Sequence, residues 1–279
     1  MEKILITKAS GEREAFSESK LRRSLQRVHT SPALVDEIVA QVETELIDGV
    51  KTSEIYRKAF SLLRKKARPV AARYSLRNAL MEMGPTGRPF ERFVGELLKS
   101  EGFDVKVAQI VQGVCVKHEV DVVGTKGDRH IMVECKFHNQ PGLRSDVKIS
   151  LYVQARFEDV ERQWKKQPSH GQKFHEVWLV TNTKLTSDAT DYAVCVGMHA
   201  IGWNYPTTGS LEQLIEQHNL HPLTCLTLLN RSQKQELMKE GLMLCKDVLE
   251  NRDALQKIVG TPARVDEIMK EARELLKIV

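Results

Sequence analysis

His118-Glu119-Val120-Asp121-Val122-Val123 and Ile131-Met132-Val133-Glu134-Cys135-Lys136-Phe137 are two short runs rich in β-branched residues, joined by the glycine-containing segment 124–129. Such runs favour strands, and glycine in the connection supplies the positive φ angles that a tight reversal needs. Because side chains alternate along a strand, Glu134 and Lys136 share one face of the second strand. We therefore expect a β-hairpin that carries a charged site on that face.

Pairing of the two strands is predicted to bring Asp121 beside Glu134 and Lys136. Two carboxylates can hold a hard divalent cation. Hydrolysis of a phosphodiester suits this set, because a metal can activate water and stabilise the developing negative charge while the ammonium orients the water. The alternative is an ordinary exposed hairpin, in which Glu134 and Lys136 form a surface pair worth well under ~1 kcal/mol.

The spacing from Asp121 to Glu134-Cys135-Lys136 resembles the PD-(D/E)XK nucleases, and its surroundings resemble their Mrr-like restriction endonuclease branch. That branch typically opens with a helix of the form FE-x-x-V-x-x-L-L and then G-F, which this chain matches at residues 90–98 and 102–103. The family's proline before the Asp is replaced by the segment 118–120. The resemblance implies that Asp121 and Glu134 bind Mg²⁺ or Mn²⁺ and that Lys136 positions water.

Two helices are expected to contribute further polar groups to this site. Glu91, on the helix before the hairpin, is a candidate third acidic group, and a plain solvated helix position is an equal alternative. After the hairpin, residues 147–163 are predicted to form a helix, and the resemblance makes Gln154 a candidate. A buried strand at 176–182, a helix at 186–198 and a strand at 200–204 then form a right-handed crossover unit.

Residues 1–84 are predicted to form a separate nucleotide-binding domain. A strand at 4–7, a turn, a return strand and a helix opened by Ser17 are followed by further helical stretches at 34–47 and 52–83. This order and its motifs resemble the ATP-cone, the nucleotide-sensing module of ribonucleotide reductases and their repressors. The resemblance implies that ATP or dATP binds at Lys8, Glu14, Ser17, Lys20, Thr52 and Tyr56. The family usually has a second basic residue after Lys8, where this chain has Ala9.

Composition bounds the remaining possibilities. A chain of 279 residues suggests about two domains, and no apolar run approaches the ~18 residues of a membrane span. The N-terminus lacks the features of a signal peptide, so we expect a cytoplasmic protein. The net charge of +5 arises from residues 1–84, so a DNA-binding surface elsewhere needs local placement of basic groups. The five cysteines show no zinc or disulfide pattern, and Cys135 is expected to face the core.

The fold class expected is α/β, with three parts. A mainly helical ATP-cone with a small β element occupies 1–84, a restriction-endonuclease-like mixed sheet flanked by helices occupies 85–210, and a helical segment occupies 211–279. Glycines and prolines at 84–89 mark the first boundary. The last segment is expected to form helices at 210–219, 231–240, 246–257 and from 260 onward. It is loosely like a helix-hairpin-helix, with a structural cap or dimerisation element as the alternative.

These observations favour a Mg²⁺-dependent DNA endonuclease whose N-terminal domain binds ATP or dATP as a regulatory ligand. The alternative is a nucleotide-responsive DNA-binding regulator in which the nuclease fold does not cut. The predicted partners are DNA and nucleotide, with a homo-oligomer as a further possibility and no membrane. The presence of an Asp, a Glu and a Lys at catalytic spacing favours the enzyme.

Overall fold

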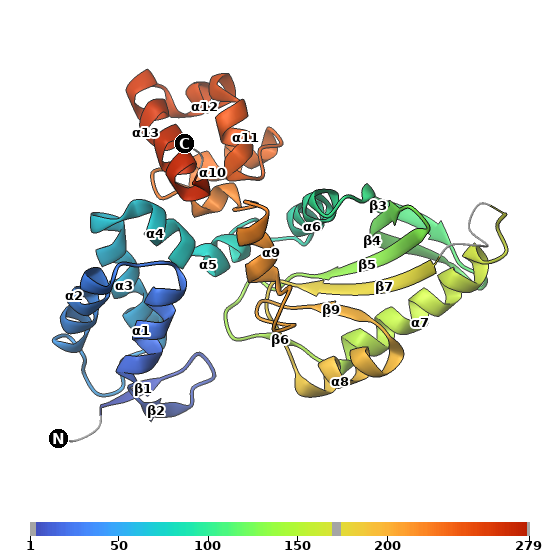
Figure 1. The fold of residues 1–279 in the computed structure, drawn as a ribbon, viewed down its shortest axis with the longest axis horizontal. Coiled ribbons are helices and arrows are strands. Elements are labelled where there is room, and N and C mark those ends of the chain that lie inside the picture. The colour runs from blue at the N-terminus through green and yellow to red at the C-terminus, as the bar shows by residue number, and fades with distance from the viewer. Residues whose placement is uncertain (1–3, 169–173, 278–279) are drawn as a thin grey trace. The chain divides into compact units, whose positions relative to one another are not determined.

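The computed structural model describes residues 4–168 and 174–277 (Figure 1). The chain forms two compact units, of which Met1–Ala79 with His221–Val279 make the first and Leu80–Leu220 make the second. The predicted α/β class with a mixed sheet is confirmed. Within the described ranges, no helix is both long and apolar enough to cross a membrane.

The N-terminal part of the first unit combines a short β ladder with helices that share one core. The structure has β1 Leu5–Thr7 antiparallel to β2 Arg13–Ala15, then α1 Glu18–Arg27, α2 Pro32–Glu43, α3 Thr52–Lys66 and α4 Arg68–Tyr74. Ser17 begins α1 as expected, since its hydroxyl accepts a hydrogen bond from the backbone N–H of Lys20 at 3.3 Å. The core contains Leu25, Ile38 and Leu63, one from each of the first three helices.

The helical stretch predicted at residues 52–83 forms three helices, α3, α4 and α5 (Leu76–Met81). Pro69 lies in the first turn of α4. A proline has no N–H to donate to the preceding turn, so α3 cannot continue through it. The backbone extends at Ala67, with φ −151° and ψ 76°, and α4 then packs against α3.

The C-terminal part of the first unit is helical, as expected. It contains the 3-10 turn η1 Leu223–Cys225, then α10 Arg231–Lys239, α11 Cys245–Glu250, α12 Arg252–Val259 and α13 Pro262–Leu276. The helix predicted at 246–257 is broken at Asn251 into α11 and α12. Buried Glu271 of α13 accepts hydrogen bonds from the backbone N–H groups of Thr227 and Leu228. These bonds hold the connection between η1 and α10 against α13.

A five-stranded mixed sheet forms the centre of the second unit. Its strands, in spatial order, are β3 Asp104–Gln112, β4 Lys117–Lys126, β5 Arg129–Lys136, β7 Phe174–Thr181 and β9 His199–Ile201. The first three are antiparallel, and β5, β7 and β9 run parallel. The edge strand β3 was not among the strands predicted from sequence. A small parallel pair, β6 Arg144–Ser145 with β8 Lys184–Leu185, lies beside the sheet.

Helices cover both faces of this sheet, as Figure 1 shows. The helix α6 Arg88–Ser100 packs on β3, β4 and β5, whereas α7 Val147–Trp164 and α8 Ser187–Val196 cover the other face. The short α9 Leu211–Gln217 follows β9. In α6, Phe93, Leu97 and Leu98 are buried.

Two details of the predicted hairpin differ in the structure. Strands β4 and β5 extend toward each other, so that only Gly127 and Asp128 form the turn, and Gly127 has the positive φ of 59° that such a turn requires. The charged face of β5 is also partly covered, unlike the ordinary exposed hairpin that the sequence left as the alternative. Met132 is fully buried under α7, because a strand with a parallel partner is usually covered on both faces.

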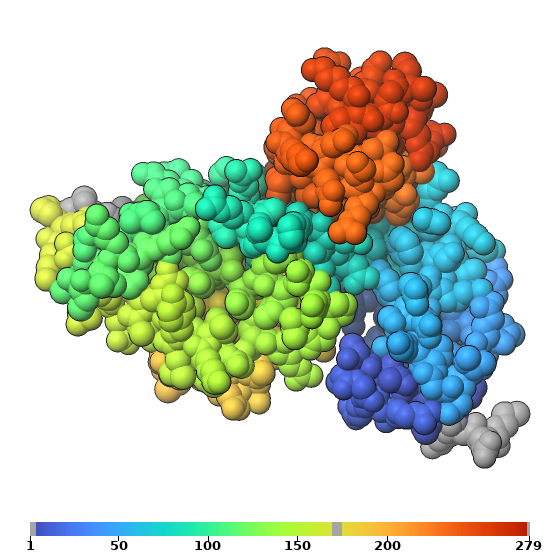
Figure 2. Space-filling model, turned by 180° about the vertical axis from the view of Figure 1, so that it is seen from behind, coloured from blue at the N-terminus to red at the C-terminus, as the bar shows by residue number. Residues whose placement is uncertain are grey.

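The connection between β3 and β4 is held to α7 by one carboxylate. Asp159 accepts hydrogen bonds from the backbone N–H groups of Cys115 (2.9 Å) and Val116 (3.3 Å) and pairs with His118 Nε2 (2.9 Å). A Cβ on Gly113 would lie 2.1 Å from Asp159 Oδ2, so only glycine fits there. In Figure 2 the β3–β4 region (green) and α7 (yellow-green) lie side by side.

We predict that Asp159→Asn lowers the melting temperature at pH 7, because the amide group loses one acceptor for these N–H donors. The hydrogen bond from His118 holds the pKa of Asp159 well below its usual range. The carboxylate therefore stabilises the fold above its unfolded-state pKa of ~4, and this stabilisation is lost as the pH falls through the lower folded-state pKa. The difference in melting temperature between Asp159→Asn and wild type should begin to shrink below about pH 4 and should vanish only below the lower folded-state pKa. The exposed Asp128→Asn serves as control, and equal melting temperatures at pH 7 would contradict the prediction.

Candidate active site

Asp121 lies where β4 separates from β5. The paired register of the two strands runs from Lys126 and Arg129 to Val122 and Val133. At the next residue the Asp121 carboxylate replaces the backbone as acceptor, because its Oδ2 accepts the N–H of Cys135 at 2.7 Å. The side chain therefore holds the two strands at the point of separation and is itself fixed by the backbone of β5.

Glu134 is directed to the face that α7 covers, and there it pairs with Arg156. The guanidinium Nη1 donates to Glu134 Oε2, and Nη2 donates to the backbone carbonyl oxygen of Glu119. The guanidinium carbon also lies 5.1 Å from the centre of the Tyr152 ring. Arg156 is only 9% exposed, so this pair is largely shielded from water.

A hollow of about 380 Å³ gathers the acidic and basic side chains. Glu91 enters it from the first turn of α6, Asp121 from β4, and Glu134 and Lys136 from β5. The other residues in its wall are Pro85, Gly87, Cys135, Phe137 and Asn139. The structure thus brings together four of the side chains that the sequence predicted as catalytic.

Three carboxyl groups, those of Glu91, Asp121 and Glu134, line this hollow, and burial disfavours the charged form of each. Burial, and then the neighbouring Asp121, raise the pKa of Glu134 to about 7, although Arg156 opposes the shift. Burial also raises the pKa of Asp121 and of Glu91 above their ordinary values. The thiol of Cys135 is buried as expected, and burial raises its pKa as well.

The donor set fits a hard divalent cation, because Asp121 and Glu134 offer carboxylate oxygens and Glu91 stands in the same hollow. A cation would neutralise the charge that raises these pKa values. In the part of the chain that the structure describes, no three His, Cys, Asp or Glu side chains are yet arranged as metal ligands. The carboxylate of Glu134 is instead engaged by Arg156.

The N-terminal domain brings together two of its predicted phosphate-binding lysines around one carboxylate. Glu14 lies 2.9 Å from Lys8 Nζ and 3.1 Å from Lys20 Nζ, while Lys8 also contacts Glu12. These hydrogen bonds lower the pKa of Glu14 and raise that of Lys8. Ser17 caps the helix that carries Lys20, so four of the predicted residues lie together at the start of α1.

The other two predicted nucleotide contacts lie on α3. Thr52 is the first residue of α3, and the backbone N–H of Thr7 donates to the carbonyl of Val50 just before it at 2.9 Å. Tyr56, one turn later, stacks on Tyr74 with ring centres 5.1 Å apart. The start of α3 is therefore fastened to β1.

Comparison with known proteins matches separate segments of the chain to separate families. Family models described as ATP cone domain, restriction endonuclease and AF1548-like, C-terminal, match residues 4–80, 83–201 and 221–276. An uncharacterized protein of Archaeoglobus fulgidus is 37% identical over 184 residues, which cover 66% of this chain and 99% of that protein. The chain belongs to the AF1548-like family. Its predicted fusion of an ATP-cone with a restriction-endonuclease domain is confirmed.

A solved relative supports the fold of the larger part of the chain. The crystal structure of AF1548, a protein of unknown function, shares 35% identity and a TM-score of 0.56 with this chain. The match covers 69% of this chain and 99% of AF1548. Nothing in these descriptions assigns an activity to either relative of this AF1548-like protein.

The site residues predicted on α7 of this AF1548-like chain differ from those that the structure shows, at Gln154 and Arg156. Gln154 is on α7 as expected, but its amide nitrogen donates to Glu158 at 3.1 Å, and the hollow's wall does not include it. Arg156 was not predicted as a site residue. A signal existed, since Arg156 falls on the same helical stripe as the buried Val153 and Val160, where a charge needs a buried partner.

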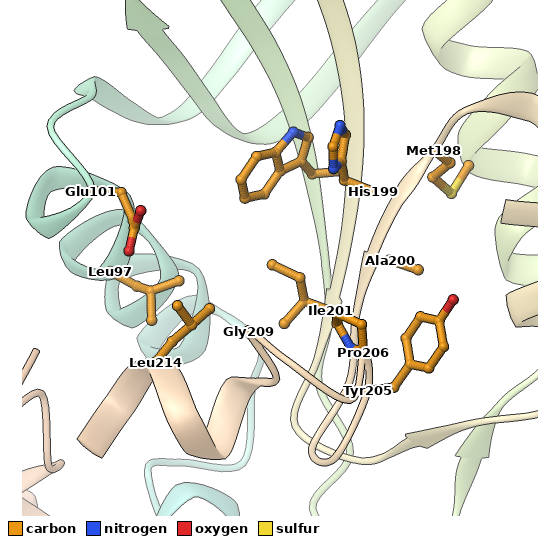
Figure 3. Close-up of a pocket in the computed structure, with 11 residues that line it drawn as sticks. Leu97, Glu101, Met198, His199, Ala200, Ile201, Tyr205, Pro206, Gly209 and Leu214 are labelled. Atoms are coloured by element: carbon orange, nitrogen blue, oxygen red, sulfur yellow. The ribbon is translucent and has the colours of Figure 1, made fainter. Parts of the chain in front are cut away.

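A second hollow, of about 330 Å³, lies between α6, α9 and the strands β7 and β9. Figure 3 shows Leu97, Glu101 and Leu214 on one side of it and His199 and Ile201 on the other. Two polar side chains in its wall have partners elsewhere, because Glu101 pairs with His218 at 2.5 Å and His199 with Glu176 at 3.3 Å. It lacks the clustered carboxylates and ammonium of the first hollow, which remains the candidate active site.

Proposed function

We propose that this AF1548-like protein is a Mg²⁺-dependent DNA endonuclease that nucleotide binding at its ATP-cone regulates. The observation that carries the proposal is the hollow in which Asp121, Glu134, Glu91 and Lys136 meet. A restriction-endonuclease family model over residues 83–201 supports the choice of DNA as substrate. The division at 1–84, 85–210 and 211–279 stays our proposal for the domains.

Each side chain has a distinct role in the proposed reaction. Asp121 and Glu134 would hold Mg²⁺ or Mn²⁺, which supplies Lewis-acid activation of water and neutralises charge on the phosphate. Lys136 would orient the attacking water, and Glu91 would provide a further acceptor from the first turn of α6. For Gln154 the proposal rests only on its helix, since its amide nitrogen is bonded to Glu158.

The proposed regulatory ligand is ATP or dATP. Lys8 and Lys20 are basic groups of the kind that bind a triphosphate, beside the N-terminus of α1. A triphosphate would have to displace the Glu14 carboxylate that both ammoniums now contact. We therefore expect modest affinity, which the absence of a basic residue at Ala9 reduces further.

A DNA-binding regulator that does not cut is the second candidate. The observation that favours it is the engagement of Glu134 by Arg156, which leaves no ready three-ligand metal site in the described residues. Cleavage experiments separate the two candidates directly, because only the nuclease produces new DNA ends.

We predict that Glu134→Gln and Lys136→Met each reduce Mg²⁺-dependent cleavage of plasmid DNA by at least about 100-fold, the usual scale for removing one electrostatic catalytic group. Glutamine is chosen because alanine would leave buried Arg156 facing an empty space, which destabilises a fold. Lys99→Met, which removes a lysine on the exposed end of α6, is the control. Cleavage by Glu134→Gln at the wild-type rate would refute the assignment.

Metal removal provides an independent prediction. Thorough treatment with EDTA should stop cleavage, and added Mg²⁺ or Mn²⁺ should restore it, because carboxylate oxygens suit both ions. The measurement is conversion of supercoiled plasmid to nicked or linear forms. Activity that survives chelation would point to a mechanism without a metal.

We also predict that millimolar ATP raises the melting temperature of wild type and does much less for Lys8→Ala or Lys20→Ala. A ligand that binds only the folded state stabilises it by RT ln(1 + [L]/Kd), so the shift reports affinity. Lys58→Ala removes a lysine of α3 that pairs with Glu45 instead, and it should respond like wild type. The absence of both a thermal shift and calorimetric heat with ATP and dATP would leave the cone without its proposed ligand.

A further inference from the structure

The geometry points to Arg156 as an internal counter-ion that competes with the divalent metal for Glu134. Arg156 holds this carboxylate, and metal binding requires the carboxylate to leave it. Arg156 is thus a positioning residue, and its effect is to weaken metal binding. The inference rests on the proposed metal site at Asp121 and Glu134.

Three contacts place the guanidinium, and only one of them involves the metal site. Nη1 donates to Glu134, whereas Nη2 donates to the backbone carbonyl of Glu119 and the ring of Tyr152 lies against the cation. A planar guanidinium with separate donors can lose one partner and keep the others. Arg156 can therefore release Glu134 without itself becoming an isolated buried charge.

The charges in the hollow make this exchange necessary. Asp121, Glu134 and Glu91 line one hollow, and the Arg156 guanidinium donates to Glu134, so its positive field acts on the proposed ligands. A divalent cation at those two carboxylates would be repelled by the same field. Since Arg156 is 9% exposed, salt and water screen this repulsion only weakly.

A merely structural pair would have a different consequence. If Arg156 only kept Glu134 in the geometry that the metal needs, its removal would weaken metal binding. If Arg156 competes, removal of its charge must strengthen metal binding, provided that Glu134 is ionised. The two roles therefore predict opposite changes in affinity, and a binding experiment without DNA distinguishes them.

The test is calorimetric titration of the full chain with CaCl₂ and with MnCl₂ at pH 8.5. We expect Arg156→Gln to bind each ion at least about tenfold more tightly than wild type. Arg156→Lys keeps the charge but loses the planar set of donors, so its affinity should lie between those of wild type and Arg156→Gln.

Arg162→Gln is the matched control, because it removes the same charge from the same helix. Arg162 is exposed and lies 3.6 Å from Asp159, away from the hollow, so its variant should bind metal like wild type. Circular dichroism confirms folding of each variant. If Arg156→Gln does not fold, a severalfold tighter binding by Arg156→Lys carries the test.

Equal or weaker metal binding by the Arg156 variants overturns the inference. If wild type nevertheless cleaves DNA with Mg²⁺, the proposed function survives and only the competing role of Arg156 is lost. If neither wild type nor any variant binds Ca²⁺ or Mn²⁺, both the inference and the proposed metal site fail. Tighter binding by Arg156→Gln with no change in Arg162→Gln supports the inference.

Discussion

The hydrogen bond from the backbone of Cys135 to the carboxylate of Asp121 is the contact on which the candidate active site depends. Strands β4 and β5 are paired up to Val122 and Val133, and beyond this point a side chain provides the acceptor. Because the strands separate there, a hollow can exist at the end of β5, and the two residues that follow the fully buried Val133 border it. A carboxylate fixed by backbone on one side and open to a hollow on the other is well placed to bind a ligand.

The same arrangement creates an electrostatic problem that the rest of the hollow has to solve. Three carboxyl groups are gathered where water is scarce, and burial raises the pKa of each. A buried carboxylate needs either a proton or a cationic partner. Arg156 supplies a cation from α7 at the position where Glu134 would otherwise be unpaired. Stability without metal and affinity for metal are therefore opposed at this residue.

Local patterns allowed the central motif to be predicted, whereas its environment depended on contacts distant in sequence. The acidic spacing, the helix start at Ser17 and the inward face of α6 follow from alternation, capping and helical period. The cover that α7 provides over the Glu134 face, and the pairing of Glu134 with Arg156, could not be predicted in this way, because Arg156 is 22 residues away. The division of the helical stretch at 52–83 also has a local cause, since Pro69 prevents α3 from continuing into α4.

The two candidate sites of the chain handle their charges in the same way. In the hollow of the nuclease-like domain a cation, Arg156, holds a carboxylate that is proposed to bind metal. In the ATP-cone a carboxylate, Glu14, holds two lysines that are proposed to bind a triphosphate. In each case the protein provides a partner of the sign that its ligand would have. A ligand then has to displace an internal partner, so it would bind more weakly than at a site without such a partner. Its binding would also be coupled to a rearrangement of side chains. Such a rearrangement is what regulation requires, because a ligand shifts an equilibrium only when it favours one of two states.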